Sequence, residues 1–223
     1  MICSVHASDT AGAIAALRTD GVVVLREAVD LYHIALLRDQ MQADLPRVLA
    51  RADRPYNFNN DHVQQSPSRD RQYLFRDVLL NDQVIAVTSA ILPGVTNTFY
   101  SGNTALPGTK RQPVHGDSGH LWIDAVVPAH SIVVNVPLVD MSITNGVTEL
   151  WPGTHLIPYT TTEKDIKVDP ALIERQRAVR PPEQPEVYVG SILLRDLRLW
   201  HAGITNQSST SRPMIAMTHN AGW

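Results

Sequence analysis

The chain has 223 residues and a formal net charge of −3 at pH 7, with 43% hydrophobic and 18% charged residues. This length and composition predict one ordinary globular domain. The slight negative charge argues against a nucleic-acid partner, and no apolar run approaches the roughly 18 residues that a membrane helix needs. The N-terminus has no secretory pattern, and Cys3 is the single cysteine, which excludes an internal disulfide. We therefore expect a cytoplasmic protein without membrane partners.

The first 95 residues are predicted to be mostly helical. Good helix formers favour a helix over residues 10–20 that ends at Asp20-Gly21, and a β-branched run favours a strand over 21–25. Helical spacing of apolar residues predicts a second helix over about 30–51 and a third over 72–92. The polar, proline-containing stretch 53–71 between them is expected to be a loop.

From about residue 96 the pattern changes to short β-strands. Strands are predicted over 96–100, 119–125, 131–139, 146–151, 187–194, 199–204 and 213–218. Short strands divided by Gly, Pro and Asn indicate an antiparallel sandwich or jelly roll, so the fold class is mainly β with flanking N-terminal α-helices. The long polar segment 155–186 is expected to be a loop that covers or lines a binding site.

Three residues from two distant stretches form a candidate metal-ligand set. His115 and Asp117 flank Gly116, and residues two apart on an extended chain face the same side. His201 follows another predicted strand and supplies a third ligand. Two imidazoles and one carboxylate form the facial triad of non-haem Fe(II), which leaves coordination positions open. A His-x-Asp triplet alone is weak evidence in a chain with nine histidines.

A basic residue beyond His201 strengthens this interpretation. Arg212 opens the last predicted strand. A guanidinium forks onto a carboxylate through two parallel hydrogen bonds, so an Arg here is suited to anchor a dicarboxylate co-substrate. The order of the four residues therefore indicates a reaction type, whereas it says little about the substrate.

Two further segments make a family resemblance clear. Residues 140–155 join an Asn-Gly turn to the sequence Trp-Pro-Gly-Thr-His, and residues 20–25 read Asp-Gly-Val-Val-Val-Leu. With the metal set, these segments resemble the phytanoyl-CoA dioxygenase-like (PhyH) branch of the Fe(II)/2-oxoglutarate dioxygenases. The resemblance implies a double-stranded β-helix (jelly roll, cupin-like) in a single dioxygenase domain over 1–223. Residues 1–95 would form a mostly helical flank and 96–223 the β-helix core.

The same resemblance assigns roles to particular residues. His115, Asp117 and His201 would bind Fe(II), and Arg212 would bind the distal carboxylate of 2-oxoglutarate. With O2 as the second co-substrate, the expected reaction is oxidation of a small organic molecule, by default its hydroxylation, plausible in secondary metabolism.

Five other residues are weaker candidates for this site. Gln112 and Thr148 match positions near the co-substrate, although a solvated amide and a plain strand residue are equally good interpretations. His120, Trp122 and Asn103 are candidates for substrate contact, although Trp is more often a core residue and a polar loop is more often solvated. The sequence does not indicate an oligomeric state.

Two alternatives from other functional classes stay open. A Zn-dependent hydrolase or isomerase on a cupin-like barrel would use the same three ligands. A non-catalytic binding module would keep the fold and lose the chemistry. The Arg at 212 argues against the first, and the intact ligand set argues against the second.

Overall fold

A computed structural model describes residues 1–59, 61–120, 122, 124–159 and 166–223. The larger sheet contains β1 (Ser4–His6), β2 (Val22–Arg26), β3 (His62–Gln64), β4 (Thr96–Ala105), β5 (Ser131–Pro137), β7 (Ile192–Asp196) and β9 (Arg212–Asn220). Their order across the sheet is β1-β2-β7-β5-β9-β4-β3, and the pairs are antiparallel except for β1 with β2. The smaller sheet pairs β6 (Thr148–Leu150) with β8 (His201–Gly203).

Isolated backbone bridges extend the smaller sheet into a second wall. Met141 pairs with Val187, Leu150 with Glu183, and His115 with His201. These pairs lie opposite the large sheet, so the chain winds between two β layers, as a jelly roll does. The predicted mainly β, double-stranded β-helix fold is confirmed.

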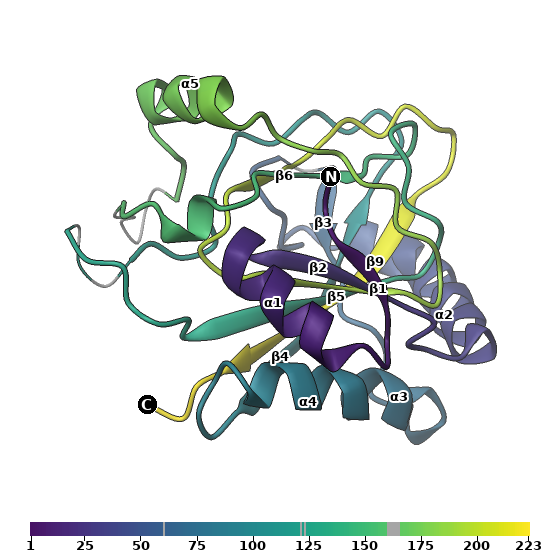
Figure 1. Cartoon of the computed structure of the whole chain (residues 1–223). Helices are drawn as coiled ribbons and strands as arrows, with labels where there is room; N and C mark the ends of the chain where they lie inside the picture. Colours follow the sequence, from purple (N-terminus) through teal and green to yellow (C-terminus); the bar gives the residue numbers. More distant parts are fainter. Residues whose placement is uncertain (60, 121, 123, 160–165) are drawn as a thin grey trace.

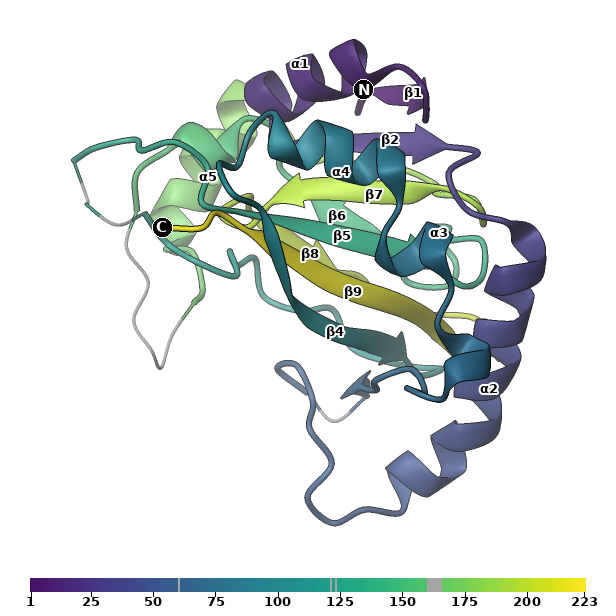
Figure 2. The ribbon, with the colours of Figure 1, turned by 90° about the horizontal axis from the view of Figure 1, so that it is seen from below.

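The helices lie outside this β core. They are α1 (Thr10–Asp20), α2 (Leu31–Leu49), α3 (Arg76–Leu79), α4 (Asp82–Ser89) and α5 (Pro170–Val179), with 3-10 turns at Arg71–Tyr73 and Thr154–Leu156. Figures 1 and 2 show α1, α3 and α4 covering one face of the large sheet, while α5 lies apart near the smaller one. None of the helices in the described ranges is long and apolar enough to cross a membrane.

The first helix is bounded as its sequence predicts. The Asp9 carboxylate accepts a hydrogen bond from the backbone N–H of Gly12, which satisfies one of the free donors at the helix start. Gly21 ends the helix in the left-handed conformation, with φ of 74°, where a residue without Cβ is favoured. The strand β2 follows at once, and its first four residues are buried.

The predicted helix over 72–92 is instead divided into three short pieces. Phe75 is extended, with ψ of 133°, and interrupts the helical path after the turn at 71–73. Asn81 then starts α4, because its side-chain oxygen accepts from the N–H groups of Gln83 and Val84. A strong N-cap inside the apolar pattern outweighed the periodicity on which the prediction rested.

The division at residue 95 also differs from the prediction. Three strands of the large sheet, β1, β2 and β3, come from the first 95 residues. The described part of 119–125 holds only a bridge between Trp122 and Ala125, because His120 donates its backbone N–H to Tyr159 at 3.0 Å instead of joining a ladder. The predicted loop 155–186 includes α5, and residues 160–165 lie outside the described part.

Two apolar clusters divide the interior. One packs α1, α2 and α4 against the outer face of the large sheet, through residues such as Leu17, Leu37 and Ile215. The other lies between the two sheets near β2 and β7, and includes Val24, Leu150 and Leu193. The space between the sheets near β9, β4 and β3 holds a cavity instead.

Burial lowers the pKa of many histidines, which predicts acid sensitivity. The residues are His62, His115, His120, His130, His155, His201 and His219. As pH falls below about 6.5, the unfolded chain gains protons that the folded chain does not, so stability is lost with falling pH. We expect the free energy of unfolding of metal-free protein to be about 2–5 kcal/mol lower at pH 5.5 than at 7.5.

Urea titrations at several pH values measure this dependence. His219 is 5% exposed and hydrogen-bonded to Thr88 at 3.1 Å, so His219→Gln removes one of these buried imidazoles while keeping a polar side chain. The variant should show a shallower loss of stability per pH unit. A stability that stays flat between pH 7.5 and 5.5 would contradict the expectation.

Candidate metal centre and cavity

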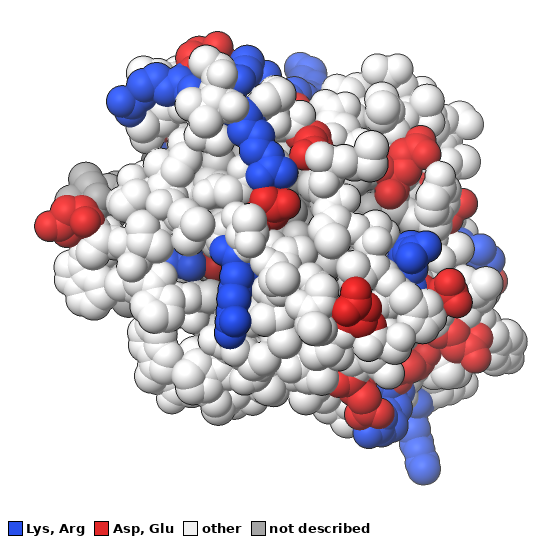
Figure 3. Space-filling model, viewed as in Figure 1, with Lys and Arg blue, Asp and Glu red and all other residues white. Residues whose placement is uncertain are grey.

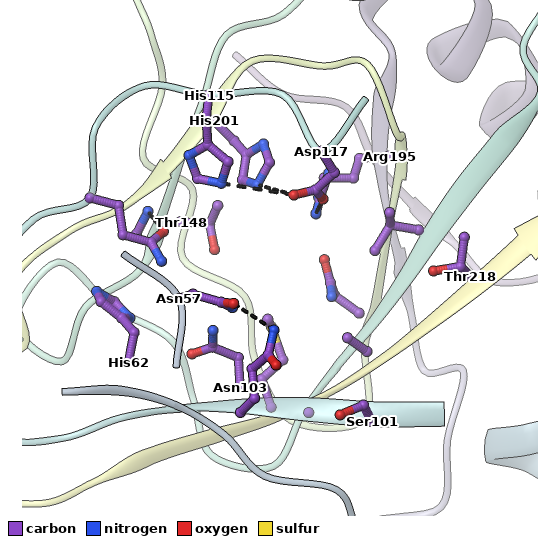
Figure 4. Close-up of a pocket in the computed structure, with 18 of the residues that line it drawn as sticks. Asn57, His62, Ser101, Asn103, His115, Asp117, Thr148, Arg195, His201 and Thr218 are labelled. Carbon is purple, nitrogen blue, oxygen red and sulfur yellow. Dashed lines mark hydrogen bonds and ion pairs between the residues drawn. The ribbon is translucent and has the colours of Figure 1, made fainter. Parts of the chain in front are cut away.

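The three predicted ligands converge on one point. One ligand atom each from His115, Asp117 and His201 lies within 4.8 Å of the others. The Nε2 atoms of His115 and His201 are 3.8 and 3.7 Å from Asp117 Oδ1. Figure 4 shows the two imidazole rings side by side, with the carboxylate directed toward them. Such a cluster has the geometry to hold one metal ion on one face, leaving the other side open to the cavity.

Backbone pairing sets the two histidines opposite each other. The N–H of His115 donates to the carbonyl of His201 at 3.0 Å, and the reverse bond is 2.8 Å. Each Nδ1 atom lies near a carbonyl oxygen, that of Pro113 at 2.9 Å for His115 and that of Leu199 at 3.0 Å for His201. A carbonyl only accepts, so Nδ1 carries the proton and the Nε2 lone pair points to the shared site.

The charge states suit a divalent cation. Burial lowers the pKa of His115 and His201, so both rings are neutral near pH 7. Desolvation alone would raise the pKa of Asp117, but Arg195, His201 and His115 outweigh it and hold the pKa well below its usual range. Neutral imidazoles and an ionised carboxylate are the forms in which these side chains bind metal.

Gly116 is required for close packing between the two ligands. A Cβ atom there would come within 1.8 Å of the Tyr159 hydroxyl oxygen. That hydroxyl donates to the carbonyl of Ser118 at 3.2 Å and closes the turn behind Asp117. Position 116 therefore needs a glycine because the Tyr159 hydroxyl approaches its backbone closely.

The ligands open into a cavity of about 290 Å³. The large sheet forms one wall and the smaller sheet, with the segment before Asp117, forms the other. The lining residues that matter for chemistry are His62, Asn103, Gln112, His115, Asp117, Asn135, Thr148, Arg195, His201, Arg212 and Thr218. Residues far apart in sequence thus meet in one chamber (Figure 4).

Arg212 lies at one end of this chamber without a partner. It is 2% exposed, and its Nε and Nη1 atoms have no hydrogen-bond partner. Burial lowers its pKa to about 10, and no ion pair involves it in the part of the chain that the structure describes. A buried, unpaired cation is costly, so the arrangement is suited to an anion that enters the cavity.

The weaker candidates separate into two groups. Gln112, Thr148 and Asn103 all line the cavity. The Gln112 side-chain oxygen accepts from the N–H of Gly203 at 2.7 Å, which fixes the amide against β8. Asn103 lies on β4 and its buried Oδ1 has no partner.

The other two predicted contacts do not reach this chamber. His120 is buried, but it is not among the cavity residues, and Trp122 is 56% exposed. The ring of His120 instead faces Tyr159, with centroids 6.3 Å apart. The structure therefore gives no support to their predicted substrate contact.

Sequence reasoning missed several residues of the cavity, above all Arg195. This residue is 6% exposed on β7, and its Nη2 donates to Asp117 Oδ2 at 2.5 Å. A signal was present, because Arg195 directly follows the apolar run 192–194 and lies two residues after the buried Leu193. His62 and Asn135 were also missed; they lie on strands whose inward faces only the sheet register defines.

The comparison of sequences identifies the family. The chain matches the description "Phytanoyl-CoA dioxygenase (PhyH)" over residues 17–214. This stretch covers most of the 223 residues and includes His115, Asp117, His201 and Arg212. The chain belongs to the phytanoyl-CoA dioxygenase family. The predicted family resemblance is therefore confirmed, and membership of this family indicates an oxygenase-type enzyme.

Solved structures agree with the family's fold. The chain is similar to AviO1 from Streptomyces viridochromogenes Tue57, with 20% identity, a TM-score of 0.68 and coverage of 96% of both chains. It is also similar to EvdMO1, with 20% identity and a TM-score of 0.69, over 96% of this chain and 50% of that one. At this identity the likeness concerns the fold.

Proposed function

We propose that this member of the PhyH family is an Fe(II)/2-oxoglutarate-dependent oxygenase that oxidises, by default hydroxylates, a small organic molecule. One observation carries the proposal: a cluster of two neutral imidazoles and one carboxylate shares a cavity with a buried, unpartnered guanidinium. The first suits Fe(II), and the second suits the far carboxylate of 2-oxoglutarate. A zinc hydrolase would use the ligand cluster but would have no use for Arg212.

In this proposal each residue has a distinct task. His115, Asp117 and His201 would hold the iron, which with O2 and 2-oxoglutarate supplies the oxidising chemistry. Arg212 would orient the co-substrate by a two-point contact. Arg212 is the first residue of β9 and lines the same cavity as the ligand cluster, so the keto acid end would be directed toward the ligands.

Two neighbours would complete the co-substrate site. Gln112, whose amide accepts from the N–H of Gly203, and Thr148 both line the cavity that holds the ligand cluster and Arg212. Their donors are suited to carboxylate or keto oxygens. The cavity volume of about 290 Å³ leaves room for a small substrate beside the co-substrate, consistent with a role in secondary metabolism.

An anaerobic titration tests the proposal directly. Purified protein is loaded with Fe(II), 2-oxoglutarate is added without O2, and the visible absorption is recorded. A metal-to-ligand charge-transfer band should rise and saturate, because the keto acid chelates the iron. Absence of the band, together with Zn-dependent hydrolysis of ester or amide substrates, would favour the alternative hydrolase. Asp117→Ala is the control that should form no band.

A further inference from the structure

A second buried guanidinium faces the cavity from the opposite end. The Nη2 atom of Arg195 donates a hydrogen bond of 2.5 Å to the Asp117 carboxylate. Its Nε and Nη1 atoms have no hydrogen-bond partner, although the side chain is only 7% exposed. Figure 4 shows Arg195 beside Asp117. Unsatisfied donors in a buried position are costly unless a ligand accepts from them.

The surroundings of Arg195 differ from those of Arg212. The sheet register places Val133 beside Arg195, Thr218 beside Val133, and Phe99 beside Thr218. All four line the cavity, as does Leu197. This end of the chamber is therefore apolar, with one hydroxyl and one guanidinium. Such a lining suits a ligand with an apolar body and one anionic or strongly accepting group.

Arg195 and Arg212 come from different rows of the large sheet, and only Arg195 bonds the Asp117 carboxylate. Arg212 and Thr218 lie six residues apart on β9, which corresponds to about 20 Å of strand. The pairing of Val133 with both Arg195 and Thr218 places Arg195 level with Thr218 across the sheet. The backbone of Arg195 is therefore at the opposite end of the sheet's cavity wall from that of Arg212. A co-substrate held by Arg212 and chelated at the ligand cluster would leave the free nitrogens of Arg195 unused.

A charge balance points to the kind of ligand. Among the described lining residues, Arg195 and Arg212 are positive and Asp117 is negative, which leaves one positive charge. The two positive charges of Fe(II) and the two negative charges of 2-oxoglutarate would cancel each other. One positive charge in a largely buried chamber therefore remains, and a singly charged anion would neutralise it.

We propose that Arg195 binds the carboxylate of the oxidised substrate. The inference rests on the proposed oxygenase function and names its substrate class: a small monocarboxylic acid with an apolar remainder. Because the same guanidinium bonds Asp117, the substrate carboxylate lies next to the metal-binding cluster. The carbon that is oxidised is therefore close to the carboxylate, and Arg195 both binds the acid and positions it.

Acetate and acetamide provide a matched pair of probes that differ only in charge. Each is added anaerobically, at constant ionic strength, to protein already saturated with Fe(II) and 2-oxoglutarate, and the shift of the charge-transfer band is measured. Acetate should perturb the band saturably and bind at least about tenfold more tightly than acetamide, as expected for a charge-assisted contact. The 2-oxoglutarate occupies Arg212, so the response reports on Arg195.

Arg195→Gln isolates the role of the guanidinium. Glutamine keeps a polar amide at this position and removes the positive charge, so the band should form while the preference for acetate disappears. Arg111→Gln is the matched control, because Arg111 pairs with Glu149 outside the cavity, and it should keep the preference. If the Arg195→Gln variant forms no band, the Arg195→Lys variant is measured in its place. Acetate should bind this variant about tenfold more weakly than the wild type, because lysine cannot make the two parallel hydrogen bonds of a guanidinium.

The outcomes separate the two proposals. A wild-type protein that forms no band contradicts the oxygenase function before acetate is added. A normal band that acetate does not perturb overturns only the substrate inference. An acetate response of the same size in Arg195→Gln as in the wild type would also overturn the substrate inference, since acetate would then bind the iron itself. Larger acids, tested against their amides, should extend the same preference if the inference holds.

Discussion

His115→Ala should abolish Fe(II)-dependent turnover of 2-oxoglutarate. The substitution removes one of three ligands, and no other His, Asp, Glu or Cys among the described residues belongs to the cluster. Even residues that only orient a ligand change metal affinity about 10- to 100-fold, so loss of a ligand should exceed that range. Succinate formation and Fe(II) binding, the latter by anaerobic titration, are the two measurements.

His120→Ala is the matched control for this experiment. His120 is 6% exposed and His115 is 4% exposed, so the substitution removes a similarly buried imidazole, three residues from Asp117. Because the ring of His120 does not line the cavity, Fe(II) binding should be retained. Equal loss of binding in both variants would mean that the effect is structural. Retention of full turnover in His115→Ala would refute the assigned metal centre.

The sequence was sufficient to predict the site residues whose type and spacing are unusual. His115, Asp117, His201 and Arg212 stand out by type and order, and the structure brings them to one cavity. Strands such as β2, β5 and β7 and the capped helix α1 were also predictable, because apolar runs and end signals are local. Local information of this kind decides which segments form and where they stop.

Other features depended on long-range pairing. Arg195 faces the cavity because β7 pairs with β5 in one register, and a shift by one residue would turn it outward. The three-residue strand β3 carries no pattern and exists because β4 accepts it at the sheet edge. The position of His120 outside the cavity lining also could not be predicted, since closeness to Asp117 in sequence does not determine which way a loop side chain points.

Arg212→Met should weaken 2-oxoglutarate binding and at the same time stabilise the metal-free protein. The guanidinium is 2% exposed and unpaired, and burial lowers its pKa to about 10, so folding is opposed by the cost of desolvating a charge. Methionine fills similar space without that cost, and we expect a gain of about 1–3 kcal/mol in the free energy of unfolding. Loss of the two-point contact should raise the 2-oxoglutarate KM about 100-fold.

Arg198→Met is the comparison that makes this result informative. Arg198 is also 2% exposed, but it is paired with Asp196 through two nitrogens at 2.9 and 2.8 Å. Its removal leaves the buried Asp196 carboxylate without a cationic partner and should destabilise the protein by about 3–5 kcal/mol. Urea denaturation of both variants measures the two free energies. Opposite signs at two equally buried arginines would show that Arg212 is kept for an anion that binds, while destabilisation in both would assign it a structural role.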